Sequence, residues 1–284
     1  MKSSLLKRVI TGAVLIAFVV GFFFLRLALV SLFNILVALM IILGSYELSS
    51  KLFLKREYPD GEVVYFAQDA EKVELIVTVI SSFLIIPAYY FFGVITAVSV
   101  VLAEIVASGL ISLIYGRGIK LFLKGILSAI YPKLLLLCIS ISNALAVNSL
   151  LALVMIFVVP SMTDTFAYFV GSTFKGVKLC PKISPNKTVS GAIGGLIGGV
   201  VSAIALYFIL PPVTNISNAW WLFIVIGLVA SILTQIGDIF ESFVKRKLGI
   251  KDMGNIFPGH GGVLDRVDGI MLASVFITIM MAII

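Results

Sequence analysis

Long apolar runs recur along the whole chain, and each is long enough to cross a lipid bilayer as a helix. Crossing roughly 30 Å of hydrocarbon takes about 20 apolar residues in helical conformation. Nine such runs lie near residues 9–25, 27–46, 75–92, 94–115, 126–146, 150–170, 190–210, 219–240 and 267–284. With 61% hydrophobic and 12% charged residues, the composition excludes an ordinary soluble domain. The sequence therefore predicts an all-α polytopic membrane protein with about nine transmembrane helices.

The fifth and sixth runs have no basic residue between them, so their division needs a separate argument. As a single helix, residues 134–169 would be about 54 Å long, which is too long for one span. We therefore expect the chain to turn back between Asn143 and Asn148. This division makes the number of spans odd, and it places the two termini on opposite sides of the membrane.

The basic residues indicate which side is cytoplasmic, because Lys and Arg concentrate in cytoplasmic loops. With nine spans, 20 of the 21 Lys and Arg residues fall on one side, and only Arg26 falls on the other. This distribution predicts a multi-pass protein of the cytoplasmic membrane, with its N-terminus in the cytoplasm and its C-terminus outside. We interpret the net charge of +7 as an inner-leaflet and anion-facing surface and expect no nucleic-acid partner.

We expect one integrated membrane domain with three parts along the chain. Residues 1–115 contain spans one to four and a cytoplasmic loop, 47–74, whose mixed charges are typical of a solvated connector. Residues 116–170 contain the middle helices and a segment that suits the membrane interface. Residues 171–284 contain the C-terminal helices and the cytoplasmic loops with the functional residues. The first run resembles a signal peptide in its charges, but it lacks a small-residue cleavage site, and we interpret it as an anchor.

Two features inside the predicted spans have a structural and a functional interpretation. Glu104 lies midway along span four, where a carboxylate is either a functional group or a neutral, hydrogen-bonded contact between helices. In span seven, Gly191, Gly195 and Gly199 recur at four-residue spacing, which allows another helix to approach closely. This packing can occur within one chain or between two copies.

The main polar segment, residues 237–269, contains Asp238, Asp265 and Asp268 in an otherwise apolar chain. Asp238 ends span eight and Asp268 begins span nine, while Asp164, further upstream, ends span six, so all three are expected at similar depth on the cytoplasmic side. Asp265 lies three residues before Asp268 and shares its face if this stretch is helical. Such oxygen ligands suit Mg²⁺, which takes one or two carboxylates together with substrate phosphates.

Basic residues, hydroxyls and glycines accompany these carboxylates. Ser184, Lys187 and Thr188 precede span seven and would offer hydroxyls, a cation and free N–H groups to an anion. The alternative for this loop is a positive-inside connector with a helix cap. The other polar groups are Lys245, Arg246, Lys251, Arg266 and the turn from Pro258 to Gly262, which includes His260. Together they predict a metal and polyphosphate site facing the cytoplasm.

This pattern resembles the signature of the phosphatidate cytidylyltransferase family, also called the CDP-diacylglycerol synthases. The residues that match are Ser242, Lys245, Arg246, Lys251, Asp252, the turn from Pro258 to Gly262, Asp265, Arg266 and Asp268. Two upstream segments, 164–168 and 184–191, resemble the family's second motif region, and the N-terminal half resembles it only in hydropathy. Phe166 replaces a small residue and Ser190 replaces a Glu, so the role of that Glu does not carry over.

The resemblance implies transfer of CMP from CTP to phosphatidic acid, which gives CDP-diacylglycerol and pyrophosphate for phospholipid synthesis. It implies Mg²⁺ as the cofactor and allows a second ion such as K⁺, and with the glycine spacing it favours a homodimer. The residues expected to bind the metal are Asp238, Asp265 and Asp268, joined in catalysis by Lys245, Arg246 and Lys251. The residues expected to bind substrates are Ser184, Lys187, Thr188, His260, Gly261, Gly262, Arg266 and Asp164. We expect a lateral cleft through which the lipid enters.

Two other functions are compatible with parts of the sequence. Another CTP-dependent lipid enzyme, such as a polyprenol kinase or a CDP-archaeol synthase, would share the nucleotide site and differ in the lipid. A transporter is compatible with nine spans and with Glu104. Transporter sites usually lie near the middle of the bilayer, however, whereas these charges gather at one surface.

Overall fold

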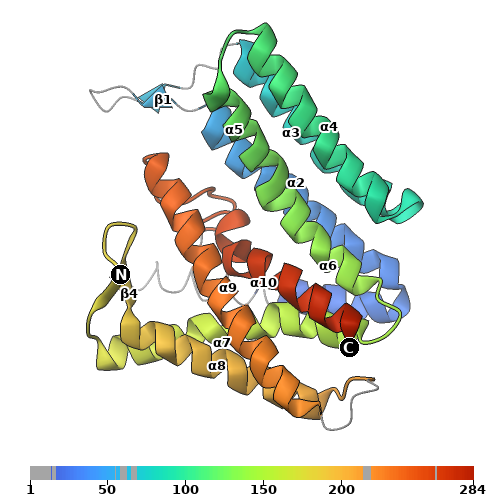
Figure 1. Ribbon diagram of the computed structural model, residues 1–284, viewed down its shortest axis with the longest axis vertical. Coiled ribbons are helices and arrows are strands. Elements are labelled where there is room, and N and C mark those ends of the chain that lie inside the picture. Colours follow the sequence, from blue (N-terminus) through green and yellow to red (C-terminus); the bar gives the residue numbers. More distant parts are fainter. Residues whose placement is uncertain are drawn as a thin grey trace. The chain divides into compact units, whose positions relative to one another are not determined.

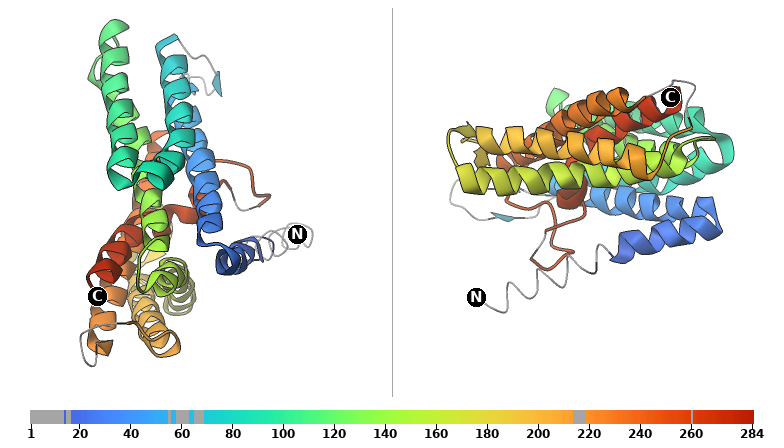
Figure 2. Two further views of the ribbon diagram at one scale, coloured as in Figure 1. Left: turned by 90° about the vertical axis from the view of Figure 1, so that its right-hand side faces the viewer. Right: turned by 90° about the horizontal axis from the view of Figure 1, so that it is seen from below.

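The computed structural model in Figures 1 and 2 describes residues 14, 17–54, 56–57, 63–64, 69–213, 219–259 and 261–284. Its helices are η1 (Val30–Leu32), α2 (Phe33–Ser49), η2 (Ser50–Leu54), α3 (Asp69–Phe92), α4 (Val94–Ile114), α5 (Ile119–Ser128), η3 (Ala129–Leu134), α6 (Leu135–Asn143), α7 (Ser149–Phe174), α8 (Val189–Ile209), α9 (Trp220–Lys247) and α10 (Leu264–Ile283). Its strands are β1 (Arg56–Glu57), β2 (Val63–Val64), β3 (Lys178–Cys180) and β4 (Ser184–Thr188).

Eight helices among the described residues are long and apolar enough to cross a membrane. They are Val30–Leu54, Asp69–Phe92, Val94–Ile114, Ile119–Asn143, Ser149–Phe174, Val189–Ile209, Trp220–Lys247 and Leu264–Ile283, and they correspond to the second to ninth predicted runs. The all-α, polytopic prediction is confirmed. The first predicted run overlaps a shorter apolar helix, Ala17–Ala28, and its residues 9–13 and 15–16 lie outside the described residues. The total of nine and the orientation of the termini stay predictions.

The chain divides into two compact units that do not follow sequence order. The first unit comprises residues 1–137 and 248–266, and the second comprises residues 138–247 and 267–284. The polar segment 237–269 thus contributes to both, and α10 begins in the first unit and continues in the second. The expectation of one integrated domain in three sequential parts stays a prediction.

In the first unit, helices that are consecutive in the chain pack side by side. Contacts join α2 with α3, α3 with α4, and α4 with α5, and Figure 1 shows α3 and α4 running alongside each other. The turn between α4 and α5 uses two glycines in the left-handed region, Gly116 (φ 61°) and Gly118 (φ 66°). A side chain would strain both positions. The segment predicted for the membrane interface begins with α5, which continues through the π-helical η3 into α6.

A buried ion pair forms the polar centre of the first unit. Lys133 Nζ lies 2.6 and 2.8 Å from the two carboxylate oxygens of Glu104, and the two side chains are 0% and 1% exposed. The hydroxyls of Thr78 and Ser81 also donate to Glu104, at 3.0 and 2.6 Å. Glu104 therefore joins α3, α4 and η3, and its main partner is an ammonium group. The segment predicted for the membrane interface, residues 120–133, thus ends at Lys133, which is buried inside the unit.

In the second unit, α8 packs against α7 on one side and α9 on the other, and Figures 1 and 2 show α7 and α8 lying side by side. The glycine ridge of α8 makes this possible. A Cβ at Gly198 would overlap the ring of Phe166 in α7, and a Cβ at Gly199 would overlap Ser231 in α9. The glycine spacing is thus used within one chain. It also accounts for Phe166, whose ring occupies the space that Gly198 leaves.

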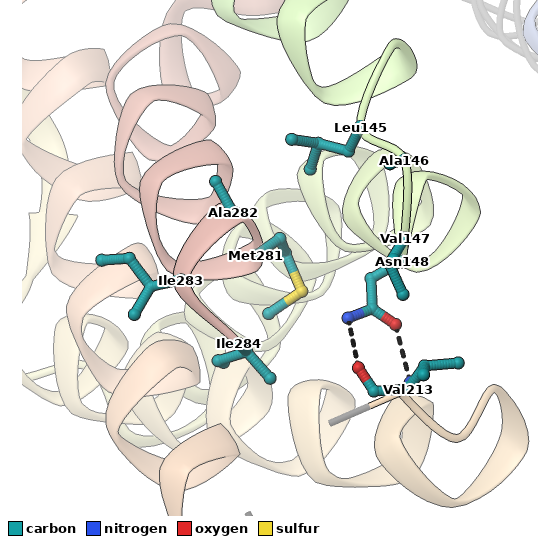
Figure 3. A pocket seen from close by; sticks show the side chains of 9 residues that line it. All are labelled: Leu145, Ala146, Val147, Asn148, Val213, Met281, Ala282, Ile283 and Ile284. Carbon is teal, nitrogen blue, oxygen red and sulfur yellow. Dashed lines mark hydrogen bonds between the residues drawn. The ribbon is translucent and has the colours of Figure 1, made fainter. Parts of the chain in front are cut away.

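The turn between α6 and α7 confirms that the chain is broken into two helices between Asn143 and Asn148. Asn148 adopts a left-handed conformation (φ 60°), and its side-chain amide makes two hydrogen bonds to the backbone of Val213, at 3.0 and 2.8 Å (Figure 3). A pocket of about 530 Å³ opens beside this turn. Its lining residues are Leu145, Ala146, Val147, Asn148, Val213, Met281, Ala282, Ile283 and Ile284, and none of them is a predicted site residue. The lateral cleft stays a prediction.

Replacing Lys133 with Met should destabilise the protein strongly, because Glu104 would keep a buried negative charge without its ammonium partner. Removing one member of a buried ion pair costs about 3–5 kcal/mol. The measurement is the midpoint of thermal unfolding in detergent. Lys182→Met, which changes an exposed lysine between β3 and β4, is the control and should leave the midpoint unchanged.

The double variant Glu104→Gln/Lys133→Met removes both charges and keeps an acceptor for Thr78 and Ser81. It should therefore unfold at a higher temperature than Lys133→Met alone. Equal midpoints for Lys133→Met and the unchanged protein would contradict the buried ion pair.

Candidate functional site

The C-terminal half of α9 presents a row of polar side chains on one face. Glu241 and Ser242 lie three and four residues after Asp238, and Lys245 lies four and three residues after them, which places all four along one side of the helix. Lys245 Nζ lies 3.3 Å from a carboxylate oxygen of Glu241, and Glu241 is fully buried. Sequence reasoning missed Glu241, although its spacing from Asp238 was an available signal.

Lys187, from β4, forms an ion pair with this row. Its Nζ lies 2.6 Å from Oδ2 of Asp238, and the two side chains are 22% and 29% exposed. Because both groups are partly exposed, a ligand can reach them. When no ligand is bound, the two opposite charges neutralise each other. Two predicted site residues that lie 51 positions apart in the sequence are thus in direct contact.

Asp268, from α10, adds a second carboxylate beside Asp238. Its charge interacts with those of Asp238 and Lys245. The close approach of α9 and α10 depends on Gly237, because a Cβ there would overlap the backbone carbonyl of Asp268. Asp164 of α7 is exposed and lies close to Gly269 of α10. A Cβ added to this glycine would be 3.9 Å from Oδ2 of Asp164. The second unit therefore gathers three of the four predicted carboxylates.

The hairpin of β3 and β4 carries the residues that we predicted to bind an anion, and it leads directly into α8. Thr188 caps this helix, because its Oγ1 accepts the N–H of Gly191 at 3.1 Å. Ser190 donates to the carbonyl of Lys175, so this departure from the family pattern ties the start of α8 to the end of α7. Arg246 Nε donates to the carbonyl of Ile183 at 3.3 Å, which holds the hairpin against α9.

Asp265 has different partners from Asp268, although both lie in the first turns of α10. Its Oδ2 accepts backbone N–H groups from Met253 and Gly262, both at 2.8 Å, and from Gly254 at 3.4 Å. Asp265 is buried in the first unit and holds the loop that precedes α10. The assignment of Asp265 to the metal stays a prediction.

A second carboxylate, Glu47 of α2, binds the same loop, and sequence reasoning missed it. Its Oε1 accepts the N–H of Val263 at 3.0 Å, and its Oε2 accepts the N–H of Leu264 at 2.9 Å. Because Glu47 follows an apolar run in the sequence, we placed it at the boundary between a span and a connecting loop. No local signal linked it to a loop more than 200 residues away.

The remaining predicted residues belong to this loop and its flanks. Lys251 and Arg266 are exposed in the first unit. Gly261 adopts a left-handed conformation (φ 81°), and its carbonyl accepts the N–H of Phe257 at 2.9 Å. The turn therefore requires a residue without a side chain at this position. His260 lies outside the described residues, so its predicted role in substrate binding stays a prediction.

The acidic pair of the second unit fits a divalent cation that is shared with phosphate. Within the part of the chain that the structure describes, no three His, Cys, Asp or Glu side chains form a group that could hold a metal. Mg²⁺ needs only one or two carboxylates when substrate phosphates complete its shell. The charges of Asp238 and Asp268 interact, Lys187 pairs with Asp238, and the charge of Lys245 interacts with that of Asp268.

Known proteins resemble this chain over most of its length. The model of the cytidylyltransferase family matches residues 6–284. A phosphatidate cytidylyltransferase of Rickettsia prowazekii is 36% identical over 182 residues, which are 61% of this chain and 77% of that protein. Those of Rickettsia conorii and Brucella abortus are each 44% identical over 122 residues, which are 41% and 43% of this chain.

The matches to the last two proteins span about half of their length, 52% and 43% respectively. The Rickettsia prowazekii match covers more than two thirds of that protein, and the family model covers nearly the whole of this chain. The protein therefore belongs to the cytidylyltransferase family.

Proposed function

We propose that the protein transfers CMP from CTP to phosphatidic acid and releases CDP-diacylglycerol and pyrophosphate. Membership of the cytidylyltransferase family and the names of the relatives support this reaction. The observation that carries it is the cluster of Asp238, Asp268, Lys187 and Lys245 in a chain with eight membrane-length helices among its described residues. Such a cluster can bind phosphate groups while the surrounding helices admit a lipid.

The reaction needs positioning and charge neutralisation more than it needs a base. An oxygen of the lipid phosphate forms a bond to the α-phosphorus of CTP, and the bond between this phosphorus and the bridging oxygen to the β-phosphate breaks. Pyrophosphate leaves with that electron pair. A phosphate monoester has a second pKa of about 6, so the attacking oxygen is already largely ionised at neutral pH. The main barrier is repulsion between two anions.

The basic residues of the second unit are suited to lowering this repulsion. Lys187 already lies beside a carboxylate, so phosphate oxygens can share its ammonium group in a charge-assisted contact. Lys245 is held by Glu241 on the adjacent turn of α9, which fixes its position before substrate binds. Arg246 is exposed at the end of the same helix and can meet a phosphate from the solvent side.

We assign Mg²⁺ to Asp238 and Asp268, whose charges interact. When bound, the ion would neutralise phosphate oxygens and align the two substrates. The role of this chain is to hold the two carboxylates in place: α9 carries Asp238, α10 carries Asp268, and Gly237 lets these helices meet. Asp265 holds the preceding loop through its backbone bonds. A second ion such as K⁺ stays a prediction.

We place the protein in the cytoplasmic membrane with this site facing the cytoplasm. The support is the one-sided distribution of Lys and Arg in the sequence. A homodimer now rests on the family resemblance alone, because Gly198 and Gly199 of α8 pack against helices of the same chain. The phosphates of CTP would then come from the cytosol, and the lipid phosphate from the inner leaflet.

The acceptor lipid distinguishes this proposal from its nearest alternative. Purified protein with labelled CTP and Mg²⁺ should convert phosphatidic acid to a lipid that carries CMP, and it should release one pyrophosphate per product. Removing divalent cations with a chelator should abolish the reaction, and added Mg²⁺ should restore it. A phosphorylated polyprenol or a CMP-linked archaeol lipid as the only product would support the other CTP-dependent enzymes instead.

Lys187→Ala should lower kcat/KM by about 100-fold, because it removes a cation from the site where two anions meet. Lys182→Ala is a matched control on the same hairpin, where the side chain is exposed. It should retain the activity of the unchanged protein. Both variants should unfold at similar temperatures, since neither change removes core packing. Normal activity of Lys187→Ala would exclude this residue from the site.

A further inference from the structure

Glu47 is a buried carboxylate that binds backbone groups of the polar loop before α10. It lies in α2, is 4% exposed, and accepts N–H groups from residues 216 and 217 positions further along the chain. These contacts lie entirely in the first unit. They connect an apolar N-terminal helix to the segment that carries the family signature.

The two N–H groups that Glu47 binds are the ones that a helix leaves unsatisfied at its start. Val263 directly precedes α10 and Leu264 is its first residue, so neither N–H has a partner within the helix. A carboxylate at this end also interacts favourably with the positive end of the helix dipole. Two charge-assisted bonds at 3.0 and 2.9 Å therefore determine where α10 begins.

The loop is shaped to admit this carboxylate. A Cβ on Gly254 or on Gly262 would overlap the Glu47 carboxylate. The loop can therefore accommodate this carboxylate only because these two residues have no side chain. Asp265 Oδ2 accepts the N–H groups of both glycines. Two buried carboxylates, one from a distant helix and one from α10 itself, thus hold the loop between residues 253 and 264.

We propose that Glu47 is a positioning residue for the reaction: by fixing the loop 253–264 and the first turn of α10, it sets where Arg266 and Asp268 present their charges. Both residues follow Leu264 within about one helical turn. A displacement of about 1 Å in a catalytic group can cost about 100-fold in rate. The inference rests on the proposed function, because it assigns Glu47 to that same reaction.

The test compares Glu47→Gln with Glu74→Gln in the full-length protein. The glutamine at position 47 keeps one acceptor but directs an NH₂ group at the second N–H donor, so one of the two bonds is lost. Glu74 is a matched control: it is a fully buried glutamate of the same unit, bonded to the side chain of Ser108 in α4. We expect Glu47→Gln to lower kcat by about 10- to 100-fold, with KM for CTP changed less than about threefold, and Glu74→Gln to keep its kcat.

Hydrogen–deuterium exchange supplies a readout that does not depend on activity. Glu47→Gln should speed the exchange of amides 253–264 and leave that of α3 and α4 unchanged, whereas Glu74→Gln should not affect this loop. Faster exchange with an unchanged kcat would overturn the positioning role and leave a structural one. Unchanged exchange would overturn the contact itself.

A second variant approaches the same contact from the loop, in case Glu47→Gln does not fold. Gly254→Ala would force the carboxylate away, and it should reproduce the loss of kcat and the faster exchange. Gly109→Ala is its control, because a Cβ there would make only an ordinary 3.5 Å contact with Phe122. If the unchanged protein forms no CMP-linked lipid, the proposed function fails and the positioning role falls with it, while the exchange data still decide whether Glu47 holds the loop.

Discussion

A charge taken out of water needs a partner inside the protein, and this requirement organises both units. The cost of an isolated buried charge is far larger than the stability of a domain. Glu104 therefore has Lys133, Glu47 has the first N–H groups of α10, Asp238 has Lys187, and Glu241 has Lys245. Each of these contacts joins separate elements or successive turns of one helix, so the polar groups add specific contacts to the packing of the apolar helices.

The two aspartates of α10 have different partners. Asp265 is bonded to backbone N–H groups and is committed to the loop, whereas Asp268 interacts with other charged side chains. A carboxylate among carboxylates and ammonium groups can exchange its partners for a metal or a phosphate. A carboxylate that holds several backbone groups cannot do so without releasing the loop. This difference explains why we assign the metal to Asp238 and Asp268.

Much of the site could be predicted because its residue types are rare in an apolar chain. Asp238, Lys187 and Lys245 stood out for this reason, and the structure brings them together in the second unit. Glu241 was missed because this stretch was interpreted from the basic residues that follow it. Glu47 and Lys133 were missed because each was interpreted by its neighbours in the sequence, as part of a span end or a loop, while their partners lie far along the chain.

The sequence alone determined the fold class, the second to ninth membrane-length helices and the break between Asn143 and Asn148, because hydropathy and helix length act along the chain itself. It also determined the family, because the signature is a run of residue types at set spacing. Only the tertiary structure decided the partners of the α8 glycines, the different partners of Asp265 and Asp268, and the contacts of Glu47 with the loop. The physical reason is that a buried charge, or a row of glycines on a helix, contacts the group that lies beside it in the folded protein. That group can be far away in the sequence, so a local sequence pattern does not identify it.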